Sequence, residues 1–116
     1  LAILDAIEQL RRLRERYAEH KLDDVAWDLL LELLRADKTA QRISVSALSI
    51  SVPHISPTTA LRRIRELVKA GHILRTPDPM DARRDFVVLA TECRTALEHY
   101  LEQVAKELAA AVTPRT

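Results

Sequence analysis

Apolar residues recur at helical spacing at both ends of the chain. Residues 1–20 and 91–112 each predict one helix, because their apolar side chains repeat every three or four positions, and Thr91 suits the N-cap of the last helix. The two stripes consist of Ile3, Ile7, Leu10 and Tyr17 in the first helix and of Leu97, Leu101, Val104 and Leu108 in the last. Narrow seams of this kind are typical of helices that pair with another helix.

Residues 23–36 form a third predicted helix, and it is apolar on nearly every side. Its leucines spread over several faces, and Trp27 and Leu31 extend the apolar surface further. Asp23 or Asp24 suits the N-cap, because a short carboxylate accepts hydrogen bonds from the amides that begin a helix. We expect this helix to lie at the centre of the fold.

Residues 43–70 predict a short strand followed by two helices. Residues 43–45 predict a strand, and Ser46 suits the N-cap of a short helix over residues 47–52. Ser56 followed by Pro57 then marks the start of a further helix, because serine is a favoured N-cap and proline a favoured first helical residue. This helix runs over residues 57–70.

Gly71, the single glycine of the chain, ends that helix, because a left-handed residue is commonly needed there. Residues 72–76 and 85–89 are β-prone, and residues 77–84 are polar and rich in turn formers. This pattern predicts a β-hairpin with a long tip.

These elements follow the order of a winged helix-turn-helix. The predicted fold is mostly α with a small β-wing, in which residues 23–90 form the core and helices 1–20 and 91–112 flank it. With 116 residues, the chain has the length of a single domain. In a helix-turn-helix the second helix enters the major groove of DNA, which makes residues 57–70 the candidate recognition helix.

The distribution of charge supports a nucleic-acid partner more than the total does. The formal net charge is only +1, but residues 39–94 hold nine Lys and Arg against five Asp and Glu. The remainder holds nine against twelve, so a basic segment at +4 stands beside an acidic remainder at −3.

Several classes of function find no support in the residues. One glycine excludes the glycine-rich loops of nucleotide-binding enzymes, and His20, His54, His72 and His99 lack a metal-binding spacing. We therefore expect no enzyme activity, no cofactor and no metal site. The longest uncharged run, residues 43–61, contains two prolines and many hydroxyl groups, so we expect no membrane segment and a cytoplasmic protein. Cys93 is the single cysteine of the sequence, so an internal disulfide is excluded.

The candidate DNA-binding residues lie on the predicted helix and at the hairpin tip. They are Ser56, Thr58, Thr59, Arg62, Arg63 and Lys69 on or before the helix, and Arg83 and Arg84 at the tip. Arginine reads guanine and threonine meets a thymine methyl group or a phosphate. Taken one by one, surface arginines more commonly serve solubility, and the hairpin arginines have Asp78, Asp81 and Asp85 as alternative partners.

Two stretches resemble the MarR-type (multiple antibiotic resistance) regulators. Residues 58–75, TTALRRIRELVKAGHILR, are similar to that family's recognition helix and first wing strand. Residues 78–89, DPMDARRDFVVL, resemble its wing signature, an Asp-x-Arg motif followed by a strand. With the preceding short helix the resemblance spans about residues 43–94. One departure is LATEC at residues 89–93, where the family commonly has Leu-Thr-x-x-Gly.

The resemblance implies a homodimeric, sequence-specific DNA-binding transcriptional regulator whose terminal helices form the dimer. It assigns base contact to Arg62, places Thr58 and Thr59 beside it, and implies that Asp81 orients Arg83 toward DNA. Double-stranded DNA and a second copy of the chain are the implied partners. A small-molecule effector is allowed but not identified. The alternative is a winged-helix module that contacts other proteins and binds no DNA.

Overall fold

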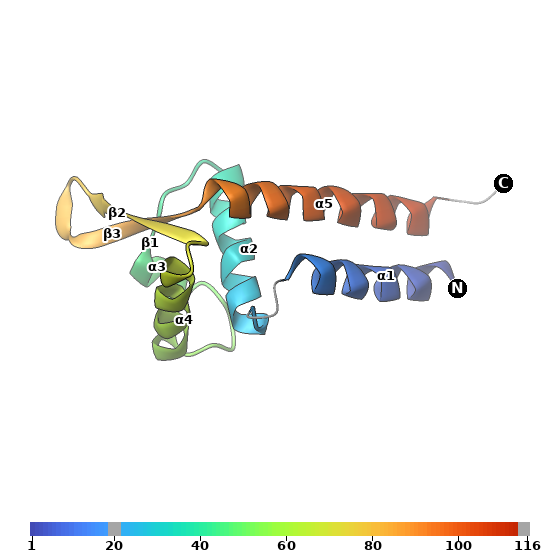
Figure 1. The fold of residues 1–116 in the computed structure, drawn as a ribbon, viewed down its shortest axis with the longest axis horizontal. Helices are drawn as coiled ribbons and strands as arrows, with labels where there is room; N and C mark the ends of the chain where they lie inside the picture. Colours follow the sequence, from blue (N-terminus) through green and yellow to red (C-terminus); the bar gives the residue numbers. More distant parts are fainter. Residues whose placement is uncertain (19–21, 114–116) are drawn as a thin grey trace. The chain divides into compact units, whose positions relative to one another are not determined.

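A computed structural model of the chain describes residues 1–18 and 22–113. Its helices are α1 (Ala2–Tyr17), α2 (Asp24–Lys38), α3 (Val45–Ser49), α4 (Pro57–Lys69) and α5 (Thr91–Val112) (Figure 1). The strands β1 (Ile43–Ser44), β2 (Ile73–Asp78) and β3 (Asp81–Leu89) form one antiparallel sheet in the order β1-β3-β2. The predicted fold class, mostly helical with a small β-wing, is confirmed. The chain divides into two compact units, residues 22–94 and the two terminal segments, which are described in turn.

Helix α2 is the centre of the unit formed by residues 22–94. Asp23 is its N-cap, because the Asp23 side chain accepts a hydrogen bond from the Ala26 amide at 2.9 Å. The buried residues of α2 are Ala26, Trp27, Leu29, Leu30, Leu33, Leu34 and Ala36. Burial on this scale, at roughly 1.5–3 kcal/mol for each large side chain, is the main stabilising contribution of the unit.

Helices α3 and α4 form the helix-turn-helix. The predicted N-cap of α3, Ser46, is wrong by two residues: Ser44 keeps an extended backbone and accepts from the Ala47 amide at 3.1 Å, so the helix already begins at Val45. The predicted cap of α4 is confirmed, because Ser56 Oγ accepts from the Thr59 amide at 3.2 Å and Pro57 opens the helix.

The wing strands are longer than predicted. β2 and β3 pair in one register from Ile73 opposite Leu89 to Pro77 opposite Asp85, and after a register shift the last pair is Asp78 with Asp81. The tip predicted over residues 77–84 is therefore irregular as expected, but it is shorter, because the strands continue to the two-residue turn at Pro79 and Met80. These residues extend beyond the core and carry polar side chains on both faces, so they lack the apolar alternation by which a strand is recognised in a sequence.

The terminal helices form the other unit, in which α1 runs alongside α5 (Figure 1). The Tyr17 hydroxyl is hydrogen-bonded to Nδ1 of His99, and the Tyr17 and Tyr100 rings meet edge to face with centroids 5.6 Å apart. Among residues 1–18 and 95–113 of this unit, few side chains are buried: Ala6, Leu13 and Leu97. Much of both predicted apolar stripes is exposed, as at Ile7 and Leu108.

The helix boundaries at the chain ends agree with prediction except at two places. α1 ends at Tyr17, and residues 19 and 20, assigned to that helix from the sequence, lie outside the described residues. α5 spans the predicted residues, but Thr91 is its first residue and not its cap. In the part of the chain that the structure covers, every helix is too short or too polar to cross a bilayer.

Gly71 allows a test of how α4 ends. Its φ is +84°, and a Cβ added there meets no atom within 4 Å, so the penalty of a side chain comes from the backbone alone. We predict that Gly71→Ala lowers the free energy of unfolding by about 1–2 kcal/mol. Gly71→Asn is the control and loses less, because asparagine tolerates this conformation better. Equal losses for the two variants in urea unfolding would contradict the backbone explanation.

Candidate nucleic-acid interface

Helix α4 has one apolar face that is buried and one basic face that is exposed. Ala60, Ile64 and Leu67 are at most 3% exposed. On the opposite side lie Thr58, Arg62, Arg65 and Lys69, and all four side chains are exposed. Their spacing of four, three and four residues aligns them along a single stripe of the helix. We call these four residues the basic stripe.

Arg65 is a member of this stripe that was not among the DNA-binding residues predicted from the sequence. Its distance of three residues from Arg62 and four from Lys69 is the signal that identifies it. Among residues 1–18 and 22–113, no ion pair or hydrogen bond engages Arg62, Arg65 or Lys69. These three cations are therefore available to an external anion.

The hydroxyl groups at the start of α4 are engaged with one another. Besides accepting from the Thr59 amide, Ser56 Oγ donates to Thr59 Oγ1 at 3.0 Å. Thr58 is exposed and belongs to the basic stripe, whereas Thr59 is half-buried. The structure thus places Ser56 as a cap and Thr58 as the outward hydroxyl.

Arg63 lies at the edge of the helix, away from the basic stripe. Its side chain is 27% exposed, and its Nε donates to Asp23 Oδ2 at 2.8 Å. Its Nη1 lies 3.3 Å from Glu66 Oε2. Burial raises the pKa of Asp23, but the hydrogen bonds from the Ala26 amide and from Arg63 outweigh it and hold that pKa below its usual value.

The two wing arginines differ in their surroundings. Arg83 is 92% exposed, and Asp81 Oδ1 accepts from its amide at 3.0 Å and lies 3.3 Å from its Nε. Arg84 donates from Nε and Nη2 to Asp78 Oδ2, at 2.9 and 2.7 Å, and lies over the Phe86 ring. Arg83 and Arg84 are therefore held by different carboxylates, Asp81 and Asp78.

Asp78 holds the tip of the wing together. Its side chain is 3% exposed, and it accepts from the Met80 amide at 2.8 Å as well as from Arg84. These hydrogen bonds, the one from Met80 first and those from Arg84 next, hold the pKa of Asp78 below its usual value. An ionised Asp78 therefore closes the tight turn and fixes Arg84.

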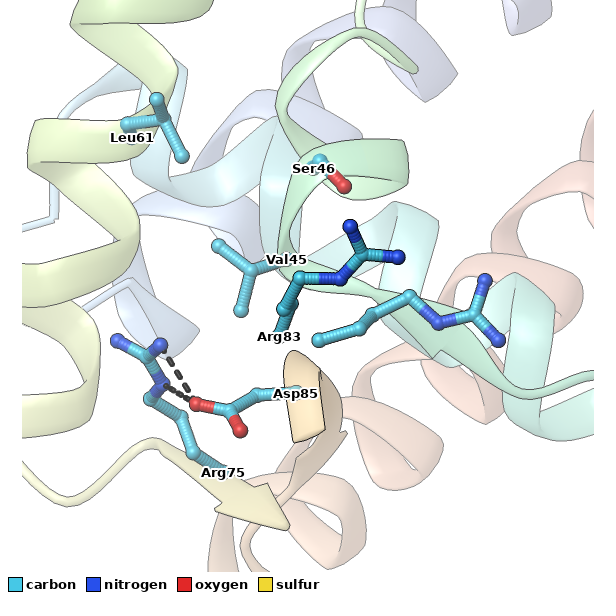
Figure 2. Close-up of a pocket in the computed structure, with 7 residues that line it drawn as sticks. Val45, Ser46, Leu61, Arg75, Arg83 and Asp85 are labelled. Atoms are coloured by element: carbon cyan, nitrogen blue, oxygen red, sulfur yellow. Dashed lines mark hydrogen bonds and ion pairs between the residues drawn. The ribbon is translucent and has the colours of Figure 1, made fainter. Parts of the chain in front are cut away.

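A hollow of about 300 Å³ lies between the wing and the helix-turn-helix. Its lining residues are Val45, Ser46, Leu61, Arg75, Arg83, Arg84 and Asp85. Figure 2 shows Arg75 paired with Asp85, which accepts from Nε at 3.1 Å and from Nη2 at 2.7 Å. Arg83 and Arg84, the other two arginines of the lining, pair with Asp81 and Asp78, so each arginine of the hollow has a carboxylate partner.

We predict that Asp78 makes the wing sensitive to acid. Because its pKa is lowered in the folded state, its stabilising effect is complete above the unfolded value of about 4 and is lost as the pH falls through the lowered value. Asp78→Asn should be less stable than the wild type at neutral pH and should lose less on acidification. Urea unfolding from neutral to acid pH checks this, with exposed Asp28→Asn as the control. Parallel pH profiles for wild type and Asp78→Asn would contradict the prediction.

Comparisons with known proteins place the fold. No protein-family model and no curated protein matches this chain. Among solved structures, a probable transcriptional regulator from Pseudomonas aeruginosa is similar at 23% identity and a TM-score of 0.61, over 98% of this chain and 82% of that one. The S. aureus MepR–DNA complex is similar at 17% identity and a TM-score of 0.69, over 91% of this chain and 81% of MepR.

The heme sensor protein PefR from Streptococcus agalactiae, solved in complex with heme, is a third similar structure. Its identity is 21% and its TM-score 0.59, over 96% of this chain and 76% of PefR. At these identities the likeness is one of fold. The resemblance to MarR-type regulators is confirmed at that level, and the chain has the winged helix-turn-helix fold that these sensors and transcriptional regulators share.

Proposed function

We propose that this chain is a sequence-specific DNA-binding transcriptional regulator that acts as a homodimer. The observation that carries the proposal is the basic stripe of α4, in which Arg62, Arg65 and Lys69 face outward on the side opposite Ala60 and Ile64. A recognition helix needs this combination, because one face must anchor it and the other must meet base edges and phosphates.

The proposed contacts follow from the position of each residue. α4 enters the major groove, where Arg62 reads a base, Thr58 meets a base or a phosphate, and Arg65 and Lys69 meet phosphates. Residues 77–85 lie at the adjacent minor groove or backbone, where Arg83, oriented by Asp81, contacts DNA. Ser56, Thr59 and Arg84 contribute by shaping these two elements. The MepR structure with DNA shows that a protein of this fold binds a duplex.

The homodimer is proposed from the terminal helices. Ile3 is 66% exposed, Ile7 58%, Leu101 40% and Leu108 49%. Exposed apolar residues in rows of this length mark interaction surfaces, and a second copy offers a matching surface by two-fold symmetry. The same symmetry presents two recognition helices to half-sites about one helical turn apart.

A small molecule is a further proposed partner. PefR was solved with heme, so proteins of this fold include ligand-responsive sensors.

The first test uses the DNA upstream of the chain's own gene. We predict that Arg62→Ala lowers the affinity for this fragment by about 1–3 kcal/mol, because it loses a base contact. Arg65→Ala should weaken binding to all duplexes alike and should reduce the slope of log affinity against log salt by about 1 per contact. Fluorescence anisotropy at several salt concentrations measures both. Arg35→Ala on α2 is the control and leaves binding unchanged.

The outcome that would overturn the proposal is a folded protein that binds neither this fragment nor a mixed-sequence duplex at low salt. That result would favour the alternative function, a winged-helix module for protein–protein contact.

The second test concerns the dimer. We predict that Leu101→Glu converts the dimer to monomers, because it places a charge in the apolar surface that the second copy covers. Analytical ultracentrifugation reports the oligomeric state, and circular dichroism checks that the helices persist. Leu74→Glu, an exposed leucine of β2, is the control and leaves the dimer intact. Dimeric Leu101→Glu or a monomeric wild type would contradict the proposed assembly.

A further inference from the structure

Arg62 and Arg63 are neighbours in the sequence, but the structure gives them different surroundings. Arg62 is exposed and belongs to the basic stripe, whereas the Arg63 side chain is only 27% exposed. One step along a helix turns the side chain by about 100°. That rotation directs Arg62 outward from the fold and Arg63 toward the start of α2.

The partner of Arg63 has two functions at once. Oδ1 of Asp23 accepts from the Ala26 amide at 2.9 Å and so caps α2. Oδ2 of the same carboxylate accepts from Arg63 Nε at 2.8 Å. The pair therefore joins the first turn of the central helix to the middle of α4, across 40 positions of sequence.

Arg63 also neutralises a second carboxylate, that of Glu66 on the same helix. Its Nη1 lies 3.3 Å from Oε2 of Glu66, whose side chain is 57% exposed. If Arg63 turned outward to a phosphate, Asp23 and Glu66 would lose their shared cation close to a polyanion. Moving Arg63 to the DNA would thus exchange two existing contacts for one new contact and add repulsion.

We propose that Arg63 is a positioning residue, which fixes the orientation of α4 through Asp23, and that it does not itself contact DNA. This inference rests on the proposed function and revises one expectation from the sequence, in which Arg63 was a DNA-binding residue. The pair sets the angle at which Arg62 and Arg65 reach the duplex, and it keeps two acidic side chains from opposing that approach.

Asp23→Asn separates the two possible roles, because their predictions have opposite signs. Asparagine caps a helix as well as aspartate does, so α2 remains capped while the ion pair to Arg63 is lost. If Arg63 positions α4, the variant binds DNA more weakly, by roughly twofold to fivefold as for a partly exposed ion pair. If Arg63 contacts phosphate, the variant binds more tightly, because a competing negative charge has been removed.

The experiment measures the affinity of the full chain for the upstream fragment over a range of salt concentrations. We expect Asp23→Asn to weaken binding, Arg63→Ala to weaken it more because it also leaves two carboxylates unneutralised, the double variant to be no weaker than Arg63→Ala, and the salt slope to stay at the wild-type value. Arg65→Ala is the matched control and lowers the slope. A lower slope for Arg63→Ala, or tighter binding by Asp23→Asn, would overturn the inference.

The wild type, Arg63→Ala, Asp23→Asn and the double variant also show whether the pair forms when no DNA is present. A double-mutant cycle in urea unfolding should show that Asp23 and Arg63 are coupled, and additive losses would overturn the inference. Because this readout needs no DNA, it separates the two claims. Wild-type protein that binds no duplex but shows the coupling refutes the proposed function and the DNA role of the pair, while the link between α2 and α4 stands.

Discussion

The packing of α4 against the rest of its unit determines what the protein presents to a partner. Ala60 and Ile64 are fully buried and Leu67 is 3% exposed, so the helix cannot rotate without exposing them to water. Replacing a buried residue such as Ile64 or Leu67 by alanine typically lowers the free energy of unfolding by about 2–5 kcal/mol, which is a large part of the stability of a small domain. The rotation of α4 about its axis is thereby set, and with it the outward direction of Arg62 and Arg65.

Around this helix the arginines divide into two groups. Arg63, Arg75 and Arg84 are each paired with a carboxylate, Asp23, Asp85 and Asp78 respectively. These pairs brace the start of α2, the body of the wing and its tip. Arg62 and Arg65 make no ion pair among the described residues, and Arg83 pairs with Asp81 at the surface while remaining 92% exposed, so these three are accessible to an external anion. A net charge of +1 therefore coexists with a basic stripe on α4, because Asp23, Asp78 and Asp85 are paired with arginines outside that stripe.

The sequence predicted well the elements that depend on local signals. Ser56 with Pro57 marked the start of α4, and Gly71 marked its end through a positive φ. The apolar surface of α2 was likewise sufficient to identify the central helix. Each of these features depends on residues within one or two helical turns, so it is readable without tertiary information.

The errors arose where a longer-range contact decides. The wing strands were predicted too short because the pairing of β2 with β3 decides where they end, and the hydropathy pattern does not report this pairing. Ser44 replaced Ser46 as the cap of α3 because pairing of β1 with β3 keeps Ser44 extended. For the arginines of α4, residue type alone does not report the surroundings of Arg63, because helical phase and the distant Asp23 determine them. The site residues themselves stay predictions until DNA binding is measured.

The most direct test of the central claim is an NMR titration of the arginine side chains. In the proposed complex, α4 meets DNA with its basic stripe while Arg63 stays paired with Asp23 at the start of α2. On addition of a duplex of about two helical turns, we expect the Nε–H signals of Arg62, Arg65 and Arg83 to shift and that of Arg63 to stay in place. A large shift for Arg63 with no change at Arg62 and Arg65 would contradict the account.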